Sequence, residues 1–141
     1  MRKLSVLKTL LVNRPEEISA YNEKKIDLKN ILIIDTICKS QKLDVKDTET
    51  VKHLSSIHHL TEMAIYINNM AVPNKTVLFI DSLTSMLLYS DENVFTKFLT
   101  DILRKMKARG INIVLLFIKT RNYDNIRQEL KYLCDQQVVF D

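Results

Sequence analysis

The chain has 141 residues, of which 46% are hydrophobic and 27% are charged, a composition typical of an ordinary globular domain. This length suits one domain, so we expect residues 1–141 to form a single unit. The formal net charge of +4 permits nucleic acid or acidic partners, yet the lysines are scattered along the chain. No apolar run reaches the roughly 20 residues that a bilayer-spanning helix needs, which argues against a membrane protein.

Cysteine and glycine usage narrows the classes further. Cys38 and Cys134 match neither a disulfide framework nor a zinc motif, so we expect a reduced, cytoplasmic protein. The chain contains one glycine, Gly110. A phosphate-cradling loop needs several glycines, because consecutive amides must approach the ligand in conformations that side chains forbid. The sequence therefore contains no P-loop of the GxxxxGK[ST] type and no GxGxxG motif.

The first third of the chain predicts two strands joined by a short helix. Residues 4–12 are apolar and strand-like, and residues 15–25 carry acids early and lysines late, as the helix dipole favours. Residues 30–37 form a continuous apolar run, typical of a strand buried on both faces, and include Asp35. The polar residues 39–52 lack a clear period and predict a long connection.

The middle of the chain predicts helix, strand and helix. The first helix has Ser55 or Ser56 as its cap, stops at Pro73, and has an apolar face formed by Leu60, Ala64, Ile67 and Ala71. Residues 76–81 predict a second buried strand. Ser90 or Asp91 then caps a helix that Gly110 closes, with an apolar stripe made of Val94, Phe95, Phe98, Leu99, Ile102, Leu103 and Met106.

The remaining residues continue the alternation. Residues 111–119 predict a third buried strand, residues 125–134 a short helix and residues 136–141 a final strand. Strands that alternate with helices indicate an α/β fold, here a three-layer sandwich around a mainly parallel sheet. Ligands bind such sheets outside the carboxyl ends of the strands. The polar residues that fall there are Asp35, Asp81, Ser82 and Lys119.

Several stretches in a fixed order together resemble a known family. They are VNRPEEI, IDLKNILIIDTICK, HHLTEMAIYI, the long run from VLFIDSLTSM to NIVLLFIK, and CDQQVVF, and they span most of residues 10–140. The pattern resembles the KaiC and RecA-like ATPases, particularly the archaeal KaiC-like group. The resemblance implies a KaiC/RecA-like core without the P-loop strand and its helix, truncated on its N-terminal side. Asp81 and Ser82 then stand at the Walker B position, which in the family helps to hold magnesium.

The departures from the family pattern decide the expected function. Asn13 and Arg14 stand where the family has its catalytic glutamates, and the phosphate cradle is missing. Phosphoryl transfer depends on electrostatic positioning, so we expect neither Mg-ATP binding nor hydrolysis by this chain alone. The leading hypothesis is a non-catalytic interaction or regulatory module that oligomerises with itself or with an active ATPase. The lost central strand requires a rearranged strand order, the N-terminal strand or a second chain in its place.

Three other functions are open on the sequence. An ATPase subunit could lend Asp81, Lys119 or Arg121, with Asp35 as an auxiliary group, to a neighbour's nucleotide site. A nucleic-acid-binding accessory protein would use the basic helix end, which comprises Arg104, Lys105, Lys107 and Arg109, although the helix dipole favours that charge anyway. A receiver-like phosphoacceptor would need the residue types of Asp35, Asp81, Thr120 and Lys119, but their order along the chain is wrong.

The three histidines complete the candidate residues. His53, His58 and His59 recur closely, but adjacent residues on a helix point about 100° apart, and no carboxylate completes a metal motif. We therefore expect no metal site, and histidines that are exposed or cap a helix.

Overall fold

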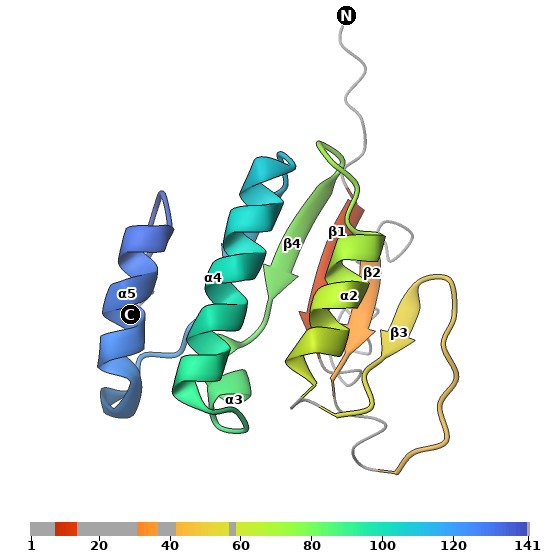
Figure 1. Ribbon diagram of the computed structural model, residues 1–141, viewed down its shortest axis with the longest axis horizontal. Helices are drawn as coiled ribbons and strands as arrows, with labels where there is room; N and C mark the ends of the chain where they lie inside the picture. The colour runs from red at the N-terminus through yellow and green to blue at the C-terminus, as the bar shows by residue number, and fades with distance from the viewer. Residues whose placement is uncertain (1–7, 14–30, 37–41, 57–58, 141) are drawn as a thin grey trace, which may run out of the picture.

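The computed structural model describes residues 8–13, 31–36, 42–56 and 59–140. Its strands form one five-stranded sheet in the order β3-β2-β1-β4-β5, and Figure 1 shows the first four of these side by side. The strands are β1 (Lys8–Asn13), β2 (Ile31–Asp35), β3 (Val51–His53), β4 (Thr76–Ile80) and β5 (Asn112–Leu115). Each of the four strand pairings is parallel, so all five carboxyl ends meet at one edge. The expected parallel sheet is confirmed for the described part of the chain.

Strand β1 holds the centre of the sheet. Leu10 lies opposite Leu32 of β2 on one side and opposite Leu78 of β4 on the other. An inner strand has both rows of its backbone groups hydrogen-bonded, and a continuous apolar sequence suits that position. The N-terminal strand is therefore the element around which the sheet is ordered.

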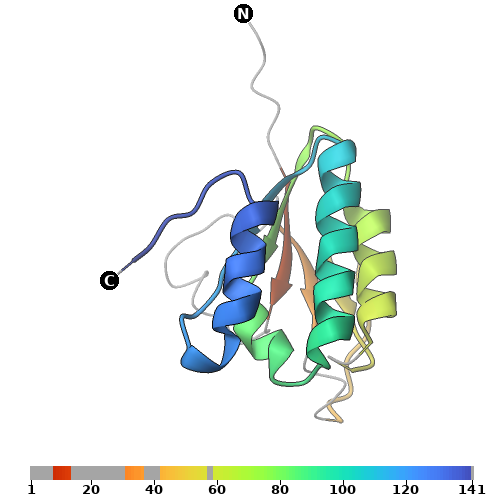
Figure 2. The ribbon, with the colours of Figure 1, turned by 60° about the vertical axis from the view of Figure 1, so that its left-hand side comes forward.

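Three longer helices cover one face of this sheet (Figures 1 and 2). They are α2 (Leu60–Met70), α4 (Glu92–Ala108) and α5 (Asp124–Leu133), and two short elements accompany them, α3 (Leu83–Leu87) and η2 (Arg121–Tyr123). None of the helices within the described ranges is long and apolar enough to cross a bilayer. The helix predicted for residues 15–25 lies outside the described residues. The structure thus establishes a mixed α/β fold with one described helical layer.

The hydrophobic core lies between the sheet and these helices. The apolar stripe predicted for α4 is confirmed with one exception, because Val94 is 57% exposed. Burying a large apolar side chain is worth about 1.5–3 kcal/mol, so this layer is the main source of stability. Its largest fully buried side chains include Phe95, Ile34, Leu54, Met63, Ile67, Leu78, Ile80 and Leu99.

Strand β5 is an edge strand, and the prediction of a third buried strand over residues 111–119 is wrong. Only Asn112–Leu115 form the strand, and its side chains alternate between exposed and half-buried. Ile113 and Leu115 pack against the core, whereas Val114 is 46% exposed on the other face. The apolar pattern is the same for a strand covered on two faces and for one covered on a single face, so the sequence did not separate the two cases.

Three further elements differ from the sequence predictions. Residues 136–140, predicted as a strand, lie outside every described strand, because none of the five strands of the sheet pairs with them. Strand β3 begins in the last two residues of the segment predicted as a connection and extends to His53, and α3 was not predicted at all. Both elements are only 3 and 5 residues long, too short to show a period in the sequence.

Glu62, rather than a serine cap, organises the start of α2. The helix begins one turn later than predicted, with His59 at the N-cap position. Ser55 donates from its backbone N–H and its hydroxyl to the Glu62 carboxylate, at 3.3 and 3.4 Å. Tyr66 donates to the same carboxylate at 3.3 Å, and the His59 ring lies equally close. Burial raises the pKa of Glu62, but these hydrogen bonds outweigh burial and leave the pKa below its ordinary value.

The C-terminal end of α4 depends on a left-handed residue. Gly110 follows the helix with a φ of 69°, a conformation that glycine adopts without steric cost, and donates to the carbonyl of Lys107 at 3.0 Å. A Cβ atom at this position would collide with the side-chain oxygen of Asn74. At the other end, Asp91 accepts from the N–H groups of Asn93 and Val94, which confirms it as the N-cap.

We predict that Glu62→Gln destabilises the fold by about 1 kcal/mol at pH 7, since a charged acceptor of several hydrogen bonds is lost. A lowered pKa in the folded state stabilises the fold above the ordinary pKa, and this contribution disappears as the pH falls through the folded value. Urea denaturation should therefore show the difference from wild type shrinking between about pH 5 and pH 3. Glu49→Gln, at an exposed site, is the matched control. A difference independent of pH would contradict the assignment.

We predict that Gly110→Ala lowers the free energy of unfolding by about 1–2 kcal/mol, because alanine is strained at positive φ and meets Asn74. Denaturant titration measures the effect. Lys105→Ala, at an exposed position in the last turn of α4, should change stability by less than about 0.5 kcal/mol. Equal stability of the two variants would show that the turn does not require glycine.

Candidate functional site at the carboxyl edge of the sheet

A row of polar residues crosses the carboxyl ends of four adjacent strands. His53 lies opposite Asp35, and Asp35 lies opposite Asn13 in the strand register. Asp81 directly follows the last residue of β4, Ile80, which lies opposite Val12, and so brings a polar residue to the end of a fourth strand. The row surrounds the point where the chain order reverses, since β1 is followed by β2 on one side and lies beside β4 on the other. This edge is the place where parallel sheets bind ligands.

Asp35 lies on the face of the sheet turned away from α2 and α4. Side chains alternate along a strand, and Ile34 and Ile80 belong to the core under these helices. Asp35, one position further along β2, therefore points to the other face. The structure brings Asp35 and Asp81 to the same edge of the sheet, with β1 between their strands.

Asp35 and His53 form a buried pair. The distance from Asp35 Oδ2 to His53 Nδ1 is 2.6 Å, and the side chains are 1% and 10% exposed. A carboxylate at Nδ1 fixes the orientation of an imidazole ring, an arrangement that can serve a general base or can simply satisfy a buried carboxylate. The expectation of an exposed or helix-capping histidine is wrong for His53. The reason is that a buried aspartate needs a partner.

The pair belongs to a network that attaches β3 and its loop to the sheet. The N–H of His53 donates to Asp47 Oδ1 at 3.0 Å, and the N–H of Leu54 donates to the carbonyl of Asp35 at 2.8 Å. Thr48 exchanges hydrogen bonds with Val51 through its backbone N–H and its hydroxyl. Strand β3 has only three residues, so these contacts do much to hold it in place. The geometry of Asp35 and His53 is thereby accounted for by a structural role.

The hydroxyl groups of the residues after Asp81 form hydrogen bonds within the protein. Ser82 Oγ accepts from the N–H of Ser85 at 3.2 Å and caps α3. Thr84 Oγ1 accepts from the N–H of Ile118 at 2.9 Å and donates to its carbonyl at 3.3 Å. Leu83 also donates to the carbonyl of Leu116. This run of polar residues therefore ties α3 to the segment that follows β5.

The basic candidates beyond β5 lie at the surface. Lys119 and Arg121 are exposed, one just before and one just after Thr120. The hydroxyl oxygen of Thr120 is buried and has no hydrogen-bond partner among the described residues. Lys119 and Arg121 lie beyond β5 at the sheet edge, with β1 and β4 between them and Asp35. The strand order therefore separates these cations from Asp35.

The basic end of α4 is partly committed to internal contacts. Arg109 donates to the carbonyls of Asn68 and Ala71, at 3.1 and 2.6 Å, and so joins α4 to the end of α2. Lys107 donates to the carbonyl of Leu133 and to Asp135. The remaining two basic residues, Arg104 and Lys105, are exposed.

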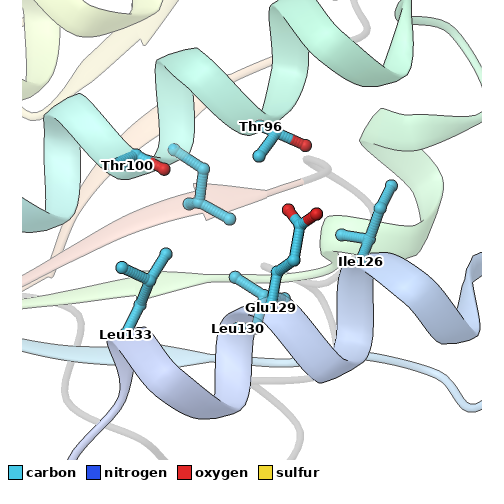
Figure 3. Close-up of a pocket in the computed structure, with 7 residues that line it drawn as sticks. Thr96, Thr100, Ile126, Glu129, Leu130 and Leu133 are labelled. Carbon is cyan, nitrogen blue, oxygen red and sulfur yellow. The ribbon is translucent and has the colours of Figure 1, made fainter.

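Neither a cluster of metal ligands nor the pocket between α4 and α5 lies at the polar row in the described part of the chain. No three His, Cys, Asp or Glu side chains gather as metal ligands in the ranges that the structure describes, and His58 lies outside them. The pocket in Figure 3 lies between α4 and α5, where Thr96 and Thr100 face Ile126, Leu130 and Leu133, and Glu129 points into the gap. It is a packing groove of the helix pair, on the opposite side of the sheet from Asp35.

Sequence reasoning found the aspartates but not their partners. Asp35 and Asp81 were identified because each follows or ends an apolar strand, whereas His53 and Asp47 were not identified as the network around Asp35. One signal was present, since an acid within a buried strand requires a hydrogen-bond donor. The choice of donor depends on strand order, which brings residues 18 positions apart together.

Comparison with known proteins found no matching family model. No curated protein matches the chain either.

We predict that Asp35→Ala lowers the free energy of unfolding by about 3 kcal/mol, because it leaves His53 buried without its acceptor. His53→Ala should cost a similar amount, and the double variant should cost at least about 1 kcal/mol less than the sum. Denaturant titration of the four proteins measures this coupling. Asp101→Ala, at an exposed site of α4, is the control and should be close to wild type. Additive effects would show that the two side chains act independently.

Proposed function

We propose that the chain is a cytoplasmic, non-catalytic interaction or regulatory module with a KaiC/RecA-like core, which binds a second copy of itself or an active ATPase. The single glycine supports this function, because a phosphate cradle cannot be built from the sequence. A KaiC/RecA-like core is itself part of the proposal and rests on the residue pattern described above.

The observation that carries the proposal is the use of the polar groups at the carboxyl edge. In an ATPase these groups would bind the nucleotide and its magnesium ion. Here Asp35 binds His53, and the hydroxyls of Ser82 and Thr84 cap α3 and bind the segment after β5. Groups that already satisfy one another offer little to a phosphate, since a new hydrogen bond to the ligand would break an existing one within the fold. The same residue pattern then serves as a scaffold.

A second candidate is an ATPase subunit that completes a neighbour's site. The exposed cations Lys119 and Arg121 favour it, because they lie at the carboxyl edge and are accessible to another molecule. A cation donated in this way acts on the charge of the transferring phosphoryl group. Asp81, at the same edge of the sheet, is a further residue that this subunit would contribute to the neighbour's nucleotide site.

We predict that calorimetric titration of the purified chain with Mg-ATP or Mg-ADP gives no binding heat at millimolar nucleotide. Asp81→Ala should leave this result unchanged. Binding that Asp81→Ala abolishes would overturn the non-catalytic assignment.

The second candidate is separated by mixing the chain with a P-loop homologue. If the chain is a non-catalytic interaction module, it changes the oligomeric state of the homologue, and Arg121→Ala does not alter this effect. A subunit that donates a cation raises the homologue's hydrolysis rate, and Arg121→Ala removes that increase, whereas the exposed Arg104→Ala serves as a charge-matched control.

A further inference from the structure

The segment after α5 is apolar and exposed. Residues 135–140 project beyond the body of the molecule in Figure 2. The side chains of Val138 and Val139 are 69% and 68% exposed, and Phe140 is 84% exposed. β-branched and aromatic residues favour strands, and three of them in a row on a surface are costly to leave in water. This segment has the composition of a strand, yet it pairs with none of the described strands.

The outer edge of β5 faces no other strand within the described ranges. The N–H and C=O groups of Leu116 bind Ile80 and Leu83, on the β4 side. Backbone groups alternate in direction along a strand, so those of Ile113 and Leu115 point to the outer edge. Exposed rows of such groups pair readily with an added strand, the recognition mode known as β-augmentation. The described sheet ends here, with β5 last in its order.

The charges of the two partners are complementary. The segment is flanked in sequence by acids, Asp135 and Asp141. Lys119 follows β5 at the carboxyl end of the strand and is exposed. Lys107 lies in α4 and pairs with Asp135 of its own chain at 3.1 Å. A segment added parallel to β5 therefore places its C-terminal acid at the strand end that Lys119 follows.

We propose that two copies of the chain exchange residues 136–140, so that each segment pairs with the outer edge of β5 in the other copy. This inference rests on the proposed interaction role and identifies the partner as a second copy. Each copy donates one segment and accepts one, so the dimer closes with two-fold symmetry and leaves neither β5 edge open.

The first test is the mass in solution. Light scattering of the full chain should give about twice the 16.5 kDa of one chain. The variant Val139→Asp/Phe140→Asp should raise the dimer dissociation constant at least about tenfold, since charged side chains cannot enter the paired strand. Tyr132→Asp is the matched control, because this aromatic residue of α5 is 91% exposed and lies outside the segment. A full chain that stays monomeric, or a dimer that the double variant does not weaken, overturns the exchange.

The second test separates exchange from pairing within one chain. In a background with Cys38 and Cys134 replaced by serine, Val114→Cys and Val139→Cys are combined and treated with a short bismaleimide. The exchange predicts a covalent dimer on a denaturing gel. A cross-link confined to the monomer shows that the segment folds onto its own β5, and the absence of any cross-link shows that the edge is unoccupied. Either of these two results overturns the proposal.

These outcomes are distinguishable from failure of the proposed function. A monomeric chain that still binds a P-loop homologue and binds no nucleotide leaves the interaction role intact and removes only the exchange. A dimer that binds Mg-ATP through Asp81 overturns the non-catalytic assignment and leaves the exchange of residues 136–140 intact.

Discussion

The parallel pairing of β1 with both β2 and β4 is the constraint on which the rest of the structure depends. A central strand satisfies its backbone groups on both sides, and its register determines which residues of its neighbours lie abreast. From this register follow the apolar layer beneath α2 and α4 and the polar row at the carboxyl edge. A shift of one residue would exchange Ile34 with Asp35 and place a carboxylate in the core.

The carboxyl edge shows how a site-like pattern can serve the fold. A buried carboxylate needs hydrogen-bond partners, and the fold supplies His53 from the neighbouring three-residue strand. The hydroxyls after Asp81 act in the same way, because they replace backbone partners that a short helix cannot provide. The polar residues that suggest chemistry in the sequence thus connect pieces too short to hold themselves in place.

The two edge strands of the sheet, β3 and β5, differ in how their outer sides are covered. Strand β3 is an edge of three residues covered by its own loop network, whereas β5 is longer and its outer side faces no described strand. Edges of the second kind attract added strands, and the chain itself carries an apolar segment that fits one. The proposed exchange would pair the open edge with the exposed segment, so the proposed interaction role depends on the strand order and not on any single residue.

The sequence by itself determined the class of fold, the positions of β2, β4, α4 and α5, the cap at Asp91 and the turn at Gly110, since apolar period, caps and glycine conformation are local properties. The sequence also excluded a glycine-rich phosphate-binding loop, because such a loop needs several glycines and the chain has one. Only the tertiary structure decided that β1 is central, that His53 pairs with Asp35, and that β5 is an edge beside an unpaired segment. These features depend on which strands become neighbours, and strand neighbours far apart in sequence are chosen by the packing of the whole domain.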